Sequence, residues 1–119
     1  MLIRFRRPIF KSGRNTTIRR GIDWAVRILM ADSTEVYYFT KEGEKPGERG
    51  IIKDYGHTVD IGAKVLRFQD IRGRDIEDNH DPYCRTYDTL LAELQKYYVG
   101  FDIAEIITVI EFYRAEGGA

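Results

Sequence analysis

Cysteine is almost absent from this sequence, which has one, Cys84, among 119 residues. A single cysteine cannot form an intrachain disulfide, so the disulfide frameworks of small secreted domains are excluded. The N-terminus also lacks a secretory signal pattern, because Arg4, Arg6 and Arg7 interrupt its only apolar stretch. Both features favour a reducing compartment, and we expect a cytoplasmic protein.

Long apolar runs are missing as well. No stretch approaches the roughly 20 apolar residues that a membrane helix needs, so we expect no membrane partner. The chain nevertheless has enough apolar material to fold, since 43% of its residues are hydrophobic and 13% are aromatic. Its length leaves room for one core. We therefore expect a single domain over residues 1–119, with a frayed tail at 116–119.

Net charge is lacking too, because 19 basic residues balance 19 acidic ones. Bulk electrostatics alone would therefore not attract nucleic acid. The distribution is uneven, however, since residues 1–20 contain no acid. The basic residues of this segment are Arg4, Arg6, Arg7, Lys11, Arg14, Arg19 and Arg20. We predict that one end of the chain is strongly cationic.

The first forty residues suggest strands around one short helical turn. An apolar segment at 2–5 predicts a strand, and the segment 7–13 predicts a helical turn that Pro8 begins and Gly13 ends. Residues 24–31 and 35–40 are rich in apolar and aromatic side chains. We predict that these two segments are strands and form a hairpin.

The middle of the chain predicts several short strands after a loop. Residues 41–50 contain three glycines and a proline with almost nothing to bury, which indicates a mobile loop. Apolar segments at 51–52, 58–61 and 65–68 are separated by Gly56 and Gly62, so we predict three short strands. A succession of short strands favours a barrel or a sandwich.

The spacing of the apolar residues changes after Thr86. Apolar residues recur there at helical spacing, Thr86 is a good N-cap, and Gly100 follows the expected end. A nearly continuous apolar run at 106–113 then predicts a central strand. The fold class that results is α+β, with about five to seven short strands, one main C-terminal helix and a short N-terminal helical turn.

This order of elements, together with two sequence blocks, resembles the ASCH family. The blocks are Lys-Ser-Gly-Arg-Asn-Thr-Thr-Ile-Arg at 11–19 and Val-Ile-Glu-Phe at 109–112, with further likeness at 63–66, 71–78 and 89–99. The resemblance covers nearly the whole chain. It implies a PUA-like mixed β-barrel with a cleft beside the first block, and a protein that binds RNA or a nucleoside.

Some ASCH proteins, the small bacterial acetylcytidine amidohydrolases, deacylate acetylcytidine with a Lys, a Thr and a Glu. The resemblance implies Thr17 as the catalytic threonine and Glu77 as the acid, with Asp78 and Asp81 as alternatives. The family lysine position holds Arg14, which cannot act as a base. Lys11 or Lys64 would have to replace it, so catalysis is the alternative to binding.

The basic block also has the chemistry of a nucleotide cleft. Guanidinium groups match phosphate, amide and hydroxyl groups reach base edges, and aromatic rings stack on unpaired bases. The residues predicted to bind the ligand are Lys11, Arg14, Asn15, Thr17, Arg19, Arg20 and Trp24. Residues two apart on a strand share a face, so Thr17 and Arg19 are expected to point into one site. The alternative is a solvated cationic turn.

Other chemistries receive less support. The segment 78–84 combines acids with His80 and Cys84, but a structural zinc site needs more Cys or His ligands than the chain offers. No ordered base accompanies Cys84 as a nucleophile, and we expect no metal and no cofactor. A third hypothesis is an interaction adaptor that pairs its cationic end with an acidic partner or with a second copy.

Overall fold

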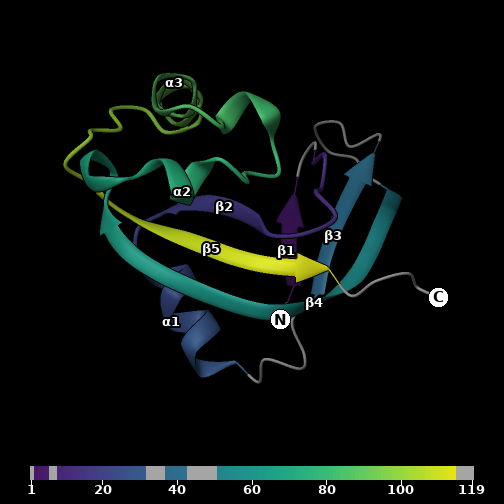
Figure 1. Cartoon of the computed structure of the whole chain (residues 1–119). Helices are drawn as coiled ribbons and strands as arrows, with labels where there is room; N and C mark the ends of the chain where they lie inside the picture. Colours follow the sequence, from purple (N-terminus) through teal and green to yellow (C-terminus); the bar gives the residue numbers. More distant parts are fainter. Residues whose placement is uncertain (1, 6–7, 32–36, 43–50, 115–119) are drawn as a thin grey trace.

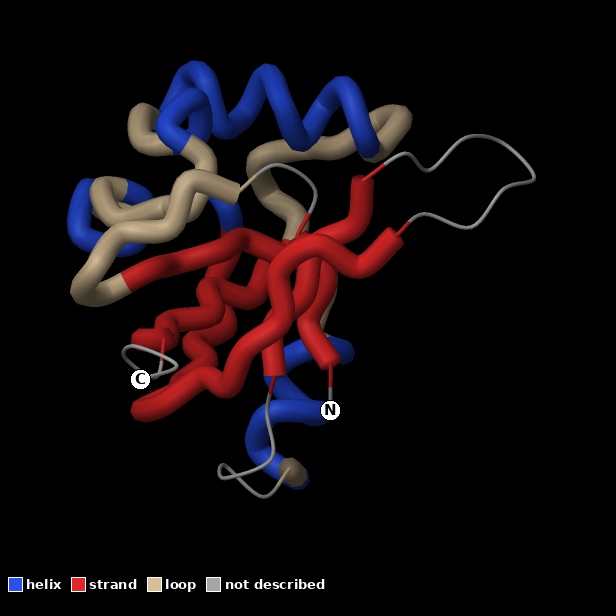
Figure 2. Tube along the Cα trace, turned by 90° about the vertical axis from the view of Figure 1, so that its right-hand side faces the viewer, coloured by secondary structure: helices blue, strands red, loops and turns tan. Residues whose placement is uncertain are grey.

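Five strands form one curled sheet in the spatial order β1-β3-β4-β5-β2. The computed structural model describes residues 2–5, 8–31, 37–42 and 51–114. The strands are β1 (Leu2–Phe5), β2 (Asn15–Arg20), β3 (Tyr37–Glu42), β4 (Ile51–Arg67) and β5 (Ile106–Arg114). Neighbouring strands are antiparallel except β1 and β3, which are parallel. Figures 1 and 2 show the sheet bent into a half-barrel.

Helices cover both faces of this sheet. They are α1 (Asp23–Met30), the single turn α2 (Gly73–Ile76) and α3 (Tyr87–Tyr97), with α1 on one side and α2 and α3 on the other (Figure 1). The helix predicted after Thr86 is confirmed, and the Thr86 side chain accepts a hydrogen bond from the Thr89 backbone N–H. None of the helices in the described part of the chain has the length and apolar content needed to cross a membrane.

Two apolar cores result, one on each face. The core under α2 and α3 contains Ile18, Phe68, Ile76, Cys84, Leu90, Leu94, Phe101, Ile107 and Val109. The core on the α1 side contains Ile3, Phe5, Ile28, Tyr38, Ile110 and Phe112. Strand β5 supplies both, because successive side chains of a strand point to opposite faces. The α+β class and the central apolar strand are therefore confirmed.

The predicted strand at 24–31 is wrong, and so is its hairpin with 35–40. Residues 23–30 form α1, in which Ala25 and Ile28 are buried three residues apart. That spacing places both on one side of a helix. Val26, Leu29 and Met30 are exposed, so the abundance of apolar residues in this segment does not indicate a strand. Strand β3 confirms the predicted strand from Tyr37 onward, and residues 35–36 lie outside the described residues.

The predicted helical turn at 7–13 is also wrong for the residues that the structure describes. Residues 8–14 form an irregular segment. The Asn15 side chain holds this segment, because its amide donates to the carbonyls of Lys11 and Gly13 and its oxygen accepts from the Lys11 N–H. These side-chain bonds replace the backbone bonds that a helical turn would make.

The three short strands predicted within 51–68 are one long strand, β4. Its register with β5 shifts between Val59 and Gly62, and Asp60 there adopts φ of 51°. This bulge bends the strand without ending it. The predicted loop at 41–50 is wrong for residues 41–42, which belong to β3; residues 43–50 and the tail 116–119 lie outside the described residues.

Arg19 links the two edges of the half-barrel. Its Nη2 donates to the backbone carbonyl of Arg4 at 2.8 Å, which joins β2 to β1. Its guanidinium carbon also lies 5.4 Å from the centre of the Phe5 ring. The described strands β1 and β2 do not pair with each other. The Arg19 side chain is therefore what connects these two edge strands.

Gly56 is required because it pairs with Tyr38 across the β3–β4 ladder, where the Tyr38 ring lies against it. A Cβ at position 56 would lie 2.5 Å from the Tyr38 hydroxyl oxygen and 2.6 Å from its ring carbon Cζ. Because Tyr38 is buried, Gly56→Ala is expected to lower the unfolding free energy by about 1–3 kcal/mol in urea titrations. Gly62→Ala is the control, because nothing lies within 4 Å of a Cβ there. Equal losses in both variants would contradict this packing.

Candidate functional site

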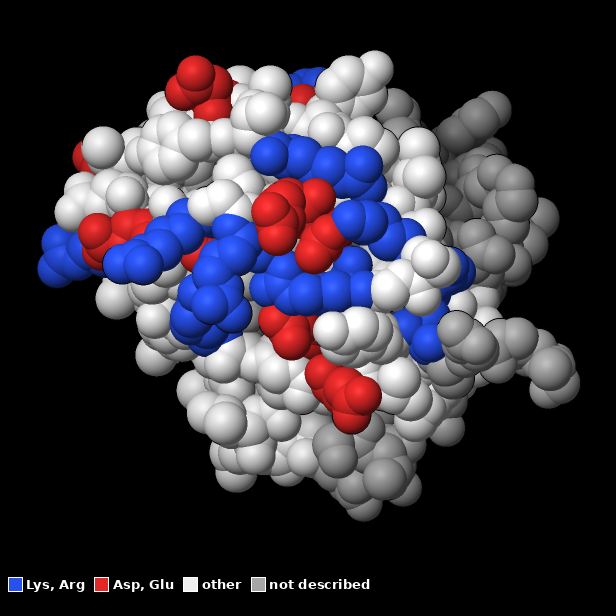
Figure 3. Space-filling view, in the orientation of Figure 1, with Lys and Arg blue, Asp and Glu red and all other residues white. Residues whose placement is uncertain are grey.

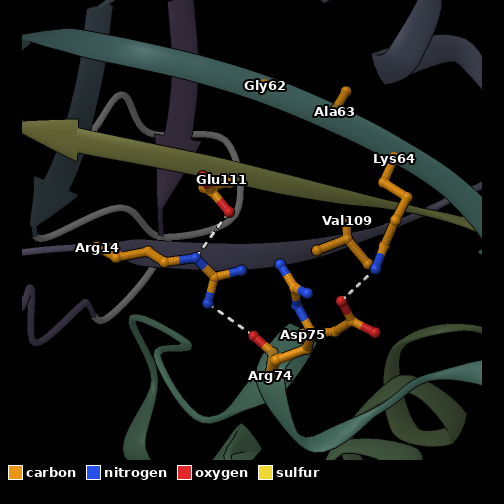
Figure 4. A pocket seen from close by; sticks show the side chains of 8 residues that line it. All are labelled: Arg14, Gly62, Ala63, Lys64, Arg74, Asp75, Val109 and Glu111. Atoms are coloured by element: carbon orange, nitrogen blue, oxygen red, sulfur yellow. Dashed lines mark hydrogen bonds and ion pairs between the residues drawn. The ribbon is translucent and has the colours of Figure 1, made fainter.

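A surface hollow lies between α2 and the strands β4 and β5 (Figure 4). Its volume is about 220 Å³. The residues that line it are Arg14, Gly62, Ala63, Lys64, Arg74, Asp75, Val109 and Glu111. Charged groups of both signs therefore surround a small apolar floor.

Strand register explains how these side chains come together. Gly62 pairs with Glu111 and Lys64 pairs with Val109, so the four residues lie on the same face of two neighbouring strands. Gly62 has no side chain, which leaves room beside the Glu111 carboxylate. The opposite wall is α2, which follows the turn after β4 and presents Arg74 and Asp75.

Arg14 occupies the centre of an ion-pair network at one end of the hollow. Its Nε donates to Glu111 Oε2 at 2.7 Å, and its Nη1 donates to the Arg74 carbonyl at 2.6 Å and to Asp78 Oδ2 at 3.1 Å. Asp78 also accepts from Lys11. The N-terminal segment, α2 and β5 are thereby tied together by one guanidinium group.

Asp78 of this network and Asp75 of the hollow are held in the charged form. The hydrogen bond from Lys11, followed by that from Arg14, lowers the pKa of Asp78. Burial alone would raise the pKa of Asp75, but hydrogen bonds from Lys64 and from the Arg72 backbone outweigh it and lower that pKa. Asp75 and Asp78 are therefore ionised at neutral pH, and each is already engaged by a cation.

Arg74 differs from the other cations of the hollow. Its side chain is exposed, and within the described residues its guanidinium makes no hydrogen bond or ion pair. Figure 4 shows this side chain directed into the space between Arg14 and Lys64. On the corresponding face of the molecule, Lys and Arg side chains surround a smaller group of acids (Figure 3). The Arg74 guanidinium therefore has N–H groups available to donate hydrogen bonds to a ligand in the hollow.

The structure separates the residues that the basic block predicted for one site. Arg14 lines the hollow, and Lys11 joins the ion-pair network of Arg14 through Asp78. Arg19 and Trp24 instead meet on the α1 side, where the Arg19 guanidinium lies 5.3 Å from the Trp24 ring centre. Thr17 is 2% exposed and belongs to the same strand face as Arg19. The expected alternation is correct, but it directs these side chains away from the hollow.

The remaining predicted residues serve other contacts. Arg20 pairs with Glu105 and lies over the Tyr98 ring, at the opposite end of β2 from Arg14. Asn15 is buried and holds the irregular N-terminal segment. Glu77 is exposed after the end of α2. The acids that meet Arg14 are Asp78, which was an alternative, and Glu111, which sequence reasoning missed.

A weak signal for Glu111 was present in the sequence. It is the single charged residue in the apolar run 106–113, and an isolated acid on a buried strand needs a cation partner. Arg74 and Asp75 gave no comparable signal, because α2 is too short to show a helical pattern. Lys64 was considered as a substitute for the family lysine, and the structure places it opposite Asp75.

The segment 78–84 does not assemble reactive groups. His80 is packed edge-on against the Phe5 ring, with ring centres 4.6 Å apart, and burial lowers its pKa to about 4. Burial also raises the pKa of the Cys84 thiol to about 12, so the thiol is inert at neutral pH. No group of His, Cys, Asp or Glu suited to a metal ion occurs in the described ranges.

Comparisons with protein-family models, curated proteins and solved structures found no match to this chain. The resemblance to the ASCH family therefore rests on the sequence blocks and element order alone, and it stays a prediction.

The lowered pKa of His80 predicts a pH-dependent stability. Protonation favours the unfolded chain, where the ordinary pKa is 6.5, over the folded one, where it is about 4. The contribution of neutral His80 is thus complete above pH 6.5 and is lost as the pH falls toward 4. Urea unfolding at about pH 7 and pH 5 should show a loss of about 2 kcal/mol from this residue.

His80→Phe provides the comparison, because a phenyl ring keeps the apolar contact and cannot titrate. Its unfolding free energy should fall less over the same pH interval than that of the wild type. An identical fall in both proteins would show that other groups cause the pH dependence.

Proposed function

We propose that this protein binds RNA or a nucleotide by its phosphate groups in the hollow beneath α2. The observation that carries the proposal is the exposed Arg74 guanidinium, which makes no hydrogen bond or ion pair with any described residue and lies between Arg14 and Lys64. A guanidinium group forms paired, charge-assisted hydrogen bonds with phosphate oxygens. Arg74 is available for such bonds without breaking an existing ion pair.

The surrounding ion pairs support this role. Arg14 is held by Glu111 and Asp78, and Lys64 by Asp75. Because these cations are already oriented, an arriving phosphate does not have to immobilise flexible side chains, which is a large part of the cost of binding. The carboxylates also limit the positive charge, so the hollow itself matches one phosphate group of the ligand.

The apolar floor supports a ligand that is more than a phosphate ion. The Val109 side chain and the backbone of Gly62 and Ala63 lie between the charged walls. A hollow of about 220 Å³ has room for a flat ring beside a phosphate group. A nucleotide unit, free or within single-stranded RNA, combines these features.

Removal of Arg74 tests the proposal. Binding of a short fluorescein-labelled single-stranded RNA and of a nucleoside monophosphate would be measured by anisotropy and calorimetry. Arg74→Gln should weaken both about tenfold, as expected for a lost charge-assisted hydrogen bond. The slope of log affinity against log salt concentration for RNA should become shallower by the amount that about one phosphate contact contributes.

Arg67→Gln is the matched control. Arg67 is exposed on the same strand as Lys64, but alternation directs its side chain to the other face of the sheet. This variant removes the same charge from a position outside the hollow, so affinity should stay within about twofold. Equal losses in both variants would show that net charge alone causes the loss of affinity. If the wild type binds neither ligand, the proposal is wrong.

A further inference from the structure

Helix α1 carries an exposed apolar stripe. The residues of the stripe are Ile22 at its N-cap, Val26, Leu29 and Met30, with exposed fractions of 50%, 46%, 80% and 83%. Residues spaced by four and three positions lie along one side of a helix. The adjoining side of α1 buries Ala25 and Ile28 against the sheet. Contiguous exposed apolar side chains of this kind mark an interaction surface.

Two unpaired charges accompany this stripe. Asp23 lies in the first turn of α1 and Arg27 in the last, and both are exposed. Neither forms an ion pair with the other or with any residue in the described part of the chain. Arg27 instead lies over the Trp24 ring, 5.2 Å from its centre, which holds the guanidinium beside the helix. The surface thus offers one unpaired charge of each sign.

We propose that α1 is a self-association surface on which the α1 helix of a second copy packs antiparallel. In that arrangement the first turn of each helix meets the last turn of the other. Asp23 of one copy then lies near Arg27 of the second copy, and the reverse contact forms as well. Such reciprocity is what a two-fold symmetric interface requires of a single surface.

Antiparallel packing also covers the apolar stripe. Val26 lies near the middle of the stripe and meets its equivalent, while Ile22 and Met30 at the two ends meet each other across the seam. Opposed helix dipoles add a small favourable term. The chain has no net charge, so no overall repulsion keeps two copies apart.

Self-association leaves the hollow accessible. Ile28 of α1 packs in one core and Ile76 of α2 packs in the other, so the two helices cover opposite faces of the sheet. A pair of chains would present two hollows to one ligand strand. Four apolar side chains are fewer than a standard interface of about 800 Å² per partner contains. We therefore expect a reversible, concentration-dependent dimer.

Sedimentation velocity over a wide range of concentrations tests this surface. The wild type should show a reversible monomer–dimer equilibrium. Leu29→Glu should raise the dissociation constant of the dimer at least about tenfold, because the charge would be buried in the seam. Val99→Glu is the control, since Val99 is 95% exposed but follows α3; it should leave the equilibrium unchanged.

A charge exchange identifies the partner as a second copy. Arg27→Glu and Asp23→Arg should each raise the dissociation constant about fivefold, because two like-charge contacts replace two ion pairs. The double variant restores opposite charges across the interface and should return the constant toward the wild-type value. Circular dichroism of each variant would verify that α1 remains folded.

Three outcomes would overturn the proposal. They are a monomer at every concentration, a dimer that Leu29→Glu does not weaken, and a double variant no tighter than the single ones. Monomeric protein that binds vesicles of anionic phospholipid, with binding lost in Leu29→Glu, would assign the stripe to a membrane surface instead.

Discussion

Burial of the sheet on both faces is the constraint on which the rest of the structure depends. Because successive side chains of a strand point to opposite sides, β5 can supply Ile107 and Val109 to one core and Ile110 and Phe112 to the other. The same rule divides the basic block. Arg14 reaches the hollow under α2, while Arg19 closes the half-barrel on the α1 side. The basic residues of one sequence segment therefore lie in two separate environments.

Arg14 and Arg19 show how environment determines the role of a guanidinium group. Arg14 has two carboxylate partners, so its charge organises a network of α2, β5 and the N-terminal segment. Arg19 is largely buried between aromatic rings and a backbone carbonyl, and burial lowers its pKa. Arg14 orients the groups of the proposed phosphate site, whereas Arg19 stabilises the approach of two edge strands.

Prediction from the sequence was correct for elements whose cause lies within the element's own residues. Thr86 caps α3 as predicted, and the unbroken apolar run predicted β5, since a strand buried on both faces needs no alternation. It failed at α1, where exposed apolar residues concealed the helical spacing of Ala25 and Ile28. It failed again at Gly56 and Gly62, because a glycine that ends a strand looks the same in sequence as one that makes room for a neighbouring ring or lies at a bulge.

The sequence by itself determined the α+β class, the helix at the C-terminal end and the concentration of basic residues near the N-terminus. Only the tertiary structure decided which of those residues share a site. Arg14 and Glu111 are 97 positions apart, and Arg14 and Arg74 are 60 apart. Such pairings depend on strand order and register, which follow from how the whole chain covers its two cores and not from any local pattern.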